Sequence, residues 1–330
     1  MKVISVDSGR HAVKSMYGDK RALFPSVVSH GREFKMDVDL NNKDYLWVNY
    51  DESEYFVGEL AIKQLAGIQE RAREKSNEYN KLLVLTAISL YVDQKDPVVL
   101  LTNIPARDWA KQRGEVKEVF LGEYMITHRA GIRQGIAVKF RIDKTYPLPE
   151  GAAAFHGYVY DENLNIRHPE FLKGNALVLD WGDETVNYVM MSNGEYVDQY
   201  CGSLDLGLHV AHAQLQKLIE EEGGEITQAE LAQHIIMDTP VYIGKRDFDI
   251  RLHAIQEYGR LSEQVINQLT GRVPFNRVRN ILNVGGGGNS LNRTIQNKLG
   301  DLCNVYSSSE GQWLNCIGQR IMYKMFTEGR

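Results

Sequence analysis

The sequence has few cysteines and no long apolar segment, which argues against a disulfide-rich protein and against a membrane-spanning one. It has three cysteines in 330 residues. Their spacing forms no metal-binding pair and their odd number does not suggest a disulfide framework, so we expect a reducing cytoplasm. No apolar run approaches the roughly 20 residues of a membrane span. The first strand is expected to begin at Lys2, which leaves no room for a secretory leader.

A strong positive charge is also missing. The formal net charge is −5 and the sequence pI is about 6.0. We therefore expect no direct nucleic-acid binding, which relies on clustered Lys and Arg. A hydrophobic content of 43% and a charged content of 25% are ordinary for a soluble globular protein. The length suggests about two domains.

The two common glycine signatures of nucleotide binding are absent as well. The chain contains neither Gly-x-Gly-x-x-Gly nor Gly-Lys-Ser/Thr. It has instead four consecutive glycines, 285–288, followed by Asn289, after an expected strand at 278–284 and before an expected helix at 291–299. Such a run brings bare backbone against a ligand, and a helix N-terminus favours an anion. A flexible strand–helix turn is the alternative.

What the chain does have is one pattern that occurs twice. An apolar strand ends in Asp7-Ser8-Gly9, and a second strand follows at 13–17. Further along, an apolar strand ends in Asp180-Trp181-Gly182, Thr185 follows, and a second strand leads to 191. Each reads as a β-hairpin with acids and glycine in its turn. The repetition predicts two related domains that face one ligand.

Hydrophobic patterning predicts the remaining elements. A polar, irregular segment at 30–60 and a charged patch at 69–80 are candidate contact surfaces for another subunit; for the patch, an exposed loop or helix face is the alternative. The run 147–155 predicts a crossover helix beginning at Pro149-Glu150. The other expected strands are 21–26, 45–48, 55–57, 97–103, 123–126, 136–141, 196–201 and 304–307, and the other expected helices are 58–61, 79–91, 107–120, 209–222, 226–237, 248–268 and 312–326.

The residue types in these turns suit a polyphosphate and a metal ion. Asp7 and Asp180 could bind Mg²⁺ through its waters, since this ion keeps several of them. Lys14 places a positive charge near the phosphates, Thr185 offers a hydroxyl, and the glycines let backbone N–H groups point at an anion. Either Asp alone is more simply explained as a turn former; together with the glycines the two favour a site.

Glu150 stands where the crossover helix is expected to begin. A carboxylate there could orient a water for attack on a γ-phosphate. The alternative is that it stabilises the positive end of the helix dipole.

The order of these motifs resembles that of the superfamily of actin, heat-shock chaperones and sugar kinases. The motifs are Asp-x-Gly with a Lys seven residues after the Asp, Pro-Glu-Gly-Ala-Ala, Asp-x-Gly-x-x-Thr-x-Asn, Val-Gly-Gly-Gly-Gly-Asn and a C-terminal helix with a glycine. The resemblance covers essentially the whole chain. It is closest to the bacterial plasmid-segregation actins of the ParM type.

This resemblance implies an α/β, ribonuclease H-like two-domain fold with a nucleotide cleft between duplicated domains. The first domain would comprise 1–155 with 308–330, including a small variable subdomain at 30–75, and the second 156–307. Asn315 and Gly318 would belong to the second connecting motif. The implied catalytic residues are Glu150, Asp180 and Asp7, the metal-binding residues are Asp7 and Asp180, and the nucleotide-binding residues are Ser8, Gly9, Arg10, Lys14, Gly182, Asp183, Thr185, Gly285, Gly286, Gly287, Gly288 and Asn289.

The implied function is a filament-forming ATPase that uses ATP or GTP with Mg²⁺. Its expected partners are further copies of itself and an adaptor protein bound to centromere-like DNA, so that it segregates plasmid or phage DNA without touching DNA or membrane. A small-molecule kinase of the same superfamily and a nucleotide-binding scaffold with little turnover are the alternatives.

The chain departs from the family in its second hairpin. Trp181, Asp183 and Glu184 stand where small residues are usual, and Asn187 stands where Asp is common. Two extra carboxylates about 4 Å from a polyphosphate would oppose its binding by roughly 1–4 kcal/mol each. We expect Arg10, beside the first turn, to compensate for one of them.

Overall fold

The computed structural model describes residues 1–34, 40, 42–64, 77–93 and 95–329. These form two compact units, each with its own sheet and core. Unit 1 comprises Met1–Gly157, Glu162–Leu164 and Asn315–Arg330, and unit 2 comprises Tyr158–Asp161 and Asn165–Leu314. Among the residues described, no helix combines the length and apolar character needed to cross a membrane.

Unit 1 is built on a mixed sheet of nine strands in the order β3-β2-β1-β7-β9-β8-β5-β6-β4. Strands β1, β7 and β9 run parallel to one another and the other neighbours are antiparallel. The strands are β1 (Lys2–Ser8), β2 (Ala12–Tyr17), β3 (Lys20–Pro25), β4 (Val28–His30), β5 (Leu46–Tyr50), β6 (Ser53–Val57), β7 (Asp96–Ile104), β8 (Gly122–His128) and β9 (Ala137–Pro149). The helices are α1 (Glu59–Lys63), α2 (Glu78–Ser89), α3 (Trp109–Val119), α4 (Ala152–Val159), whose last two residues belong to unit 2, and α9 (Leu314–Glu328), whose first residue belongs to unit 2.

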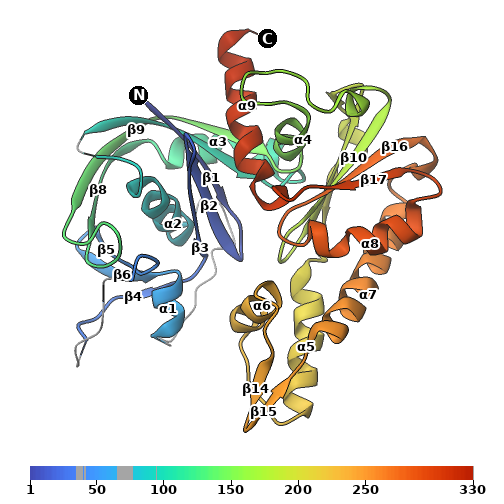
Figure 1. Ribbon diagram of the computed structural model, residues 1–330. Helices are drawn as coiled ribbons and strands as arrows, with labels where there is room; N and C mark the ends of the chain where they lie inside the picture. Colours follow the sequence, from blue (N-terminus) through green and yellow to red (C-terminus); the bar gives the residue numbers. More distant parts are fainter. Residues whose placement is uncertain (35–39, 41, 65–76, 94, 330) are drawn as a thin grey trace. The chain divides into compact units, whose positions relative to one another are not determined.

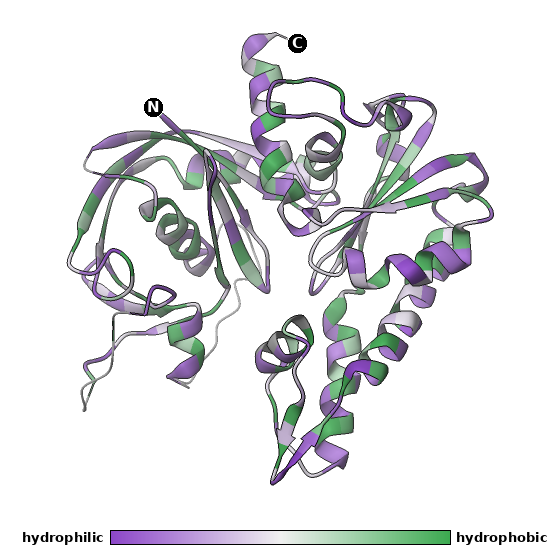
Figure 2. Ribbon diagram, in the orientation of Figure 1, coloured by the Kyte–Doolittle hydropathy of each residue, from purple (hydrophilic) through white to green (hydrophobic). Residues whose placement is uncertain are grey.

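The sheet of unit 1 curves around helix α2, which contacts β1, β2 and β8 (Figure 1). Asn77 caps this helix, because its side chain accepts a hydrogen bond from the backbone N–H of Tyr79. The helix is mainly apolar from Leu82 onward (Figure 2), and nine of its twelve residues are buried, as expected for a helix that is covered on most sides.

Unit 2 repeats the first plan on a smaller sheet of order β12-β11-β10-β16-β17. Its strands are β10 (Asn175–Trp181), β11 (Val186–Ser192), β12 (Glu195–Tyr196), β13 (Gly202–Leu204), β14 (Val241–Ile243), β15 (Arg246–Phe248), β16 (Val278–Val284) and β17 (Asn304–Ser307), its helices are α5 (Leu208–Glu221), α6 (Gln228–Ile236), α7 (Arg251–Thr270) and α8 (Gly288–Leu299), and 3-10 turns lie at Pro169–Leu172, Asp198–Tyr200, Phe275–Arg277 and Gly311–Trp313.

The repetition predicted from the two hairpins is visible in the strand order. In β3-β2-β1-β7-β9 and again in β12-β11-β10-β16-β17, an antiparallel meander is followed by two parallel neighbours. The mixed α/β fold with two related domains is therefore confirmed.

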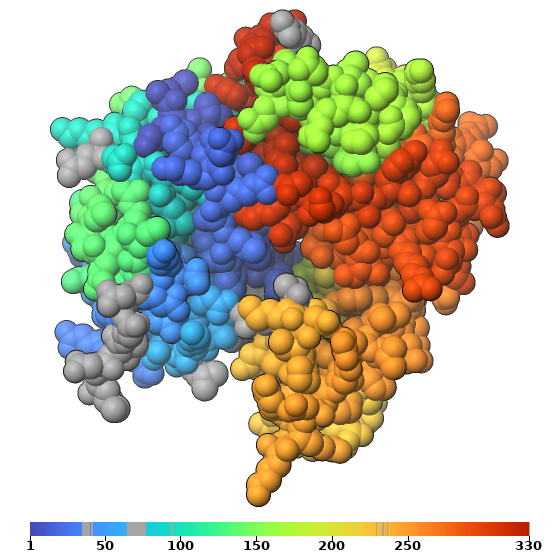
Figure 3. Space-filling model, viewed as in Figure 1, coloured from blue at the N-terminus to red at the C-terminus, as the bar shows by residue number. Residues whose placement is uncertain are grey.

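A small hairpin in unit 2 was not anticipated. Strands β14 and β15 form a projecting tip, drawn in orange in Figure 3. They pack with α5, α6 and the start of α7 in a separate apolar cluster that includes Leu215, Ile219, Leu231, Val241 and Ile243.

Two expected elements are wrong in detail. The expected strand Tyr196–Cys201 breaks after Tyr196, because the Cys201 thiol accepts the hydrogen bond from the backbone N–H of Met190 that a strand partner would take. Strand β13 resumes the pairing with β11.

The expected helix start at Pro149-Glu150 is wrong as well. Strand β9 continues through Pro149, and α4 begins at Ala152. Prolines are tolerated there because β8 pairs with β9 only as far as Ile142, which leaves the rest of β9 bonded on one side. The charged patch predicted at 69–80 lies largely outside the described residues.

Candidate functional site

In unit 1 the predicted residues gather where three parallel strands end. Strand β1 pairs with β7, and β7 pairs with β9, so their carboxyl ends meet at one edge of the sheet. Asp7 lies at the end of β1, Asn103 at the end of β7, and Glu150 directly after β9. The Glu150 backbone N–H donates to Ile104 O at 2.9 Å, which extends the ladder by one residue. Ligands of open α/β sheets bind outside this edge.

Asn103 joins the two carboxylates of this edge. Its side-chain nitrogen donates to Asp7 Oδ1 and to Glu150 Oε1, each at 2.7 Å. Asn103 is fully buried and Asp7 is 4% exposed. Sequence reasoning placed Asn103 in a buried strand and assigned it no role. The sequence feature that could have identified Asn103 is a polar side chain at the carboxyl end of a mainly apolar strand.

Lys14 balances the charge of Asp7 from the neighbouring strand. Its ammonium lies 3.2 Å from Asp7 Oδ2, and both side chains are largely buried. The Cys316 thiol contacts Lys14 O at 3.5 Å, and burial, with the charge of Asp7 as the next cause, raises the pKa of Cys316 to about 12. The thiol therefore stays neutral beside the ion pair at physiological pH.

The turn between β1 and β2 is tied to the end of β3. Ser26 Oγ donates to Gly9 O at 2.5 Å and Ser26 N donates to His11 O at 2.9 Å. Ser8 is buried, and Arg10 is half-buried within the turn. Ser26 thus holds the backbone of the turn in one conformation.

Helix α9 packs closely against the turn after Glu150 and against α4. Asn315 Oδ1 accepts a hydrogen bond from the Gly151 N–H at 3.3 Å. A Cβ on Gly318 would lie 1.6 Å from Ala153 O, so only glycine fits there. Asn315 and Gly318, the residues predicted for the second connecting motif, therefore fasten the turn that carries Glu150.

In unit 2 the glycine run lies against Asp180. Strands β10 and β16 are parallel, with Asp180 opposite Val284, so Gly285 follows at the same level. Gly285 has φ +81°, and a Cβ there would lie 2.6 Å from Asp180 Oδ1. Helix α8 begins three residues later at Gly288. The arrangement places backbone N–H groups of a helix N-terminus near a carboxylate, which suits a phosphate with its cation.

Trp181 belongs to the core of unit 2. It is the last residue of β10 and is fully buried. Its Nε1 donates to Asn283 Oδ1 at 3.0 Å, and Asn283 Nδ2 donates to Asn292 on α8 at 2.9 Å. The indole therefore anchors the strand below the turn and does not crowd the turn itself.

The turn Gly182–Thr185 closes with a hydrogen bond from Gly182 N to Thr185 O at 3.0 Å. The Asp183 side chain is 6% exposed and its Oδ1 lies 3.9 Å from His212 Nδ1. The side chain of Asp183, which was predicted to bind the nucleotide, thus points into unit 2. Asn187, at 2% exposure, accepts a hydrogen bond from the Ser203 hydroxyl.

The donor set fits a hydrated magnesium ion. The two oxygens of Asp7 each accept a bond from the chain, and a carboxylate oxygen has further lone pairs for a metal-bound water. Within the described parts of the chain, no group of three or more His, Cys, Asp or Glu side chains could enclose a metal directly.

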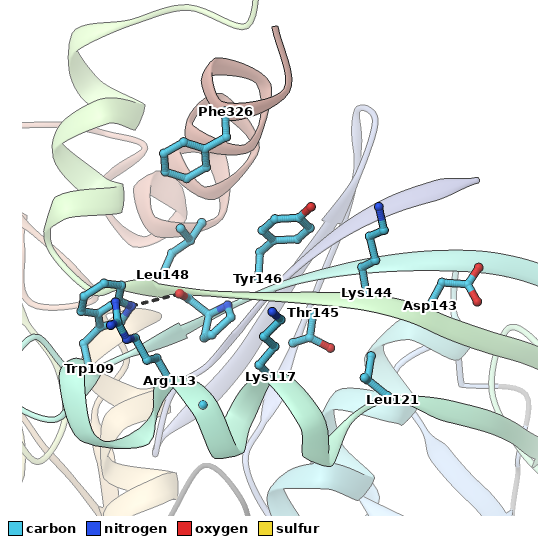
Figure 4. Close-up of a pocket in the computed structure, with 12 residues that line it drawn as sticks. Trp109, Arg113, Lys117, Leu121, Asp143, Lys144, Thr145, Tyr146, Leu148 and Phe326 are labelled. Atoms are coloured by element: carbon cyan, nitrogen blue, oxygen red, sulfur yellow. Dashed lines mark hydrogen bonds between the residues drawn. The ribbon is translucent and has the colours of Figure 1, made fainter. Parts of the chain in front are cut away.

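A surface cavity of about 640 Å³ in unit 1 is not part of this edge (Figure 4). Trp109, Arg113 and Lys117 of α3 face Tyr146 of β9 and Phe326 of α9 across it. None of the predicted site residues lines it.

Comparison with known proteins agrees with this architecture. The family model described as the N-terminal domain of actin-like proteins matches residues 5–152. The model described as the C-terminal domain of an archaeal, MreB-like actin homologue matches residues 178–297. No curated protein matches the chain significantly.

Solved structures of similar fold cover nearly the whole chain. A non-polymerisable quadruple mutant of pCBH ParM shares 22% identity with a TM-score of 0.81, over 98% of this chain and 99% of that one. A subunit of a 15-stranded ParM filament from Clostridium botulinum shares 23% identity with a TM-score of 0.80, over the same shares. The archaeal actin homologue Ta0583 in complex with ADP shares 18% identity with a TM-score of 0.77, over 98% and 99%. With both family models matched, one in each half, this chain belongs to the actin-like superfamily and resembles its ParM members.

Proposed function

We propose that this chain is a cytoplasmic ATPase that polymerises with ATP or GTP and Mg²⁺ and disassembles after hydrolysis. The observation that carries the proposal is the cluster of Asp7, Lys14, Asn103 and Glu150 at the carboxyl edge of the unit 1 sheet. Membership of the actin-like superfamily supports the same reading.

Glu150 is the residue proposed to orient the attacking water. Asn103 holds one carboxylate oxygen at 2.7 Å, which fixes the direction of the other. Catalysis of phosphoryl transfer is mainly positioning and charge stabilisation, so a carboxylate held in this way suits the task. Asp7 in unit 1 is a proposed ligand for a hydrated magnesium ion, which supplies neutralisation of the phosphate charge when bound, and Asp180 in unit 2 is proposed for the same role.

Each unit offers backbone and hydroxyl donors of the kind that bind phosphate. Ser8 and Gly9 would contribute from unit 1, and Gly182, Thr185 and the glycines 285–288 with Asn289 from unit 2. The ADP complex of Ta0583 supports a nucleotide as the ligand. Lys14 would place its charge near the phosphates, and Arg10 would compensate part of the acidic second turn.

The binding partners are proposed from the similarity of this chain to ParM structures. The relative solved as a 15-stranded filament supports self-association. An adaptor bound to centromere-like DNA would connect such a filament to plasmid or phage DNA. The sequence pI of about 6.0 favours this indirect route over direct contact with DNA.

Light scattering with parallel measurement of phosphate release tests the proposal. ATP should produce scattering that decays as phosphate appears, ADP should produce little, and a non-hydrolysable analogue should produce scattering that persists. Stable polymers without phosphate release would instead identify a scaffold. ADP formation stimulated by a sugar, without polymer, would identify a small-molecule kinase.

Glu150→Ala should slow phosphate release by roughly 100-fold or more and prolong the scattering signal, because the water loses its orienting base. The matched control is Glu118→Ala, which removes an exposed carboxylate on α3. Normal turnover in Glu150→Ala would remove Glu150 from its proposed role.

A further inference from the structure

The turn Gly182–Thr185 is tied to the first turn of helix α5. The backbone N–H of Leu208 donates to Gly182 O at 3.1 Å, and that of His209 donates to Asp183 O at 2.9 Å. The His209 ring donates to the same Asp183 oxygen through Nδ1 at 2.8 Å. The start of α5 therefore sets the position of the turn backbone.

A chain of three buried side chains continues from the turn into unit 2. Asp183 Oδ1 lies 3.9 Å from His212 Nδ1, and the two side chains are 6% and 4% exposed. His212 Nε2 lies 3.0 Å from the hydroxyl of Tyr258 on α7. Asp183 as a whole is half-buried, but its side chain is only 6% exposed. The exposed part of the residue is therefore mainly its backbone.

The tyrosine allows His212 to present a proton to Asp183 in either charge state. Burial, together with the charge of Asp183, raises the pKa of Tyr258, so the phenol stays protonated at neutral pH. A phenol can donate to a neutral Nε2 or accept from Nε2–H. When the phenol donates to Nε2, and also when the imidazole is protonated on both nitrogens, Nδ1 carries a hydrogen on the side of Asp183.

We propose that His212 is a positioning residue that holds the Asp183 carboxylate inside unit 2, off the side of the turn that meets the nucleotide phosphates. This role rests on the proposed function, because it matters only if the turn binds a polyphosphate. It explains how the turn can carry Asp183 where small residues are usual. A carboxylate that turned toward the phosphates would oppose their binding through like-charge repulsion.

A double-mutant cycle in the full chain tests this role. The variants are His212→Phe, Asp183→Asn and the two combined, and the measurement is the affinity for ATP with Mg²⁺ by calorimetry. His212→Phe should weaken binding about tenfold or more, because the Asp183 carboxylate loses the imidazole that lies 3.9 Å from it. Asp183→Asn alone should bind at least as tightly as the unsubstituted chain, and the double variant should recover to within about threefold of it. A double variant as weak as His212→Phe would overturn the role and show that His212 acts through packing alone.

Unfolding in urea without nucleotide provides a second readout. The effects of Asp183→Asn and His212→Phe should be non-additive, since the two groups interact in the folded chain. Additive effects with nucleotide binding intact would overturn only the role of His212. Absence of nucleotide binding by the unsubstituted chain would overturn the proposed function and this role with it.

Two conservative variants keep the test decisive if His212→Phe does not fold. His212→Gln retains an amide donor and should weaken binding less than a substitution without a donor. Tyr258→Phe removes only the hydroxyl that fixes Nε2 and should also weaken binding, by a smaller factor than any His212 substitution. Unchanged affinity in both would overturn the proposal.

Discussion

Asn103 donates one hydrogen bond to Asp7 and a second, from the same nitrogen, to Glu150. The proposed metal-binding and water-orienting carboxylates are thus held by one fully buried amide. Asn103→Ala should lower the rate of phosphate release by roughly 10- to 100-fold, because both carboxylates lose their alignment. Asn103→Asp should lower it further, since a third negative charge would lie between them.

The control for Asn103→Ala is Asn280→Ala in unit 2. Asn280 is also buried, and its amide donates to Glu170 O at 2.9 Å. Both substitutions should lower the free energy of unfolding by about 1–3 kcal/mol. Only the Asn103 variant should lose turnover; equal rates in the two variants would contradict the role of Asn103.

Two helical glycines should respond to alanine in opposite directions. Gly318→Ala places a Cβ 1.6 Å from Ala153 O, so α4 and α9 must separate, and the free energy of unfolding should fall by about 3 kcal/mol or more. Gly114→Ala in α3 meets no atom within 4 Å and should raise that free energy by up to about 1 kcal/mol. Urea denaturation measures both. A harmless Gly318→Ala would mean that α4 and α9 do not approach as closely as described.

His128 should make unit 1 sensitive to acid. Burial, followed by the charge of Arg133, lowers the pKa of His128 to about 4 from 6.5. Its Nε2 lies 3.0 Å from Ser89 Oγ. Between pH 6.5 and 4 the unfolded chain binds a proton that the folded chain does not. Stability is therefore intact above pH 6.5 and falls by about 3 kcal/mol as the pH approaches 4.

Thermal unfolding as a function of pH measures this effect. His128→Gln keeps a polar group near Ser89 and removes the titration, so the loss of stability between pH 6.5 and 4 should become smaller. An acid slope identical to that of the unsubstituted chain would show that His128 does not titrate as described.

The thiols should react slowly in the folded chain. Burial raises the pKa of Cys201 and Cys303, and raises that of Cys316 to about 12. At pH 8 only about one Cys316 thiol in ten thousand would be ionised, and the thiolate is the reactive form. Ellman's reagent should titrate the three cysteines rapidly in denaturant and Cys316 hardly at all without it. Rapid labelling of Cys316 in the native chain would contradict its burial.

Sequence patterning succeeded where an element is long and its ends are marked. The strand at 278–284 was predicted with its observed bounds, because an apolar run ends there in glycines. The hairpin β14–β15 was missed, because two strands of three residues carry too little alternation to be recognised. The strand expected at 196–201 failed because a thiol replaced a backbone partner, which no pattern of hydropathy records.

Candidate site residues could be proposed from the sequence where a turn combines an acid with a glycine. Asp7 and Asp180 each stand two residues before a glycine, Gly9 and Gly182, at the end of an apolar strand. Asn103 and His212 carry no such marker, since each gains its partners only when strands or helices distant in sequence come together. The direction of the Asp183 side chain likewise depends on α5 and could not be inferred from the turn.

The burial of Trp181 also gives the chain an optical property. An indole that is fully enclosed and hydrogen-bonded through Nε1 emits differently from one in water, and Trp181 directly precedes Gly182 while it is bonded to Asn283 beneath the glycine run. A change at either segment would alter the surroundings of this chromophore. The fluorescence of Trp181 should therefore report structural changes in the turn Gly182–Thr185.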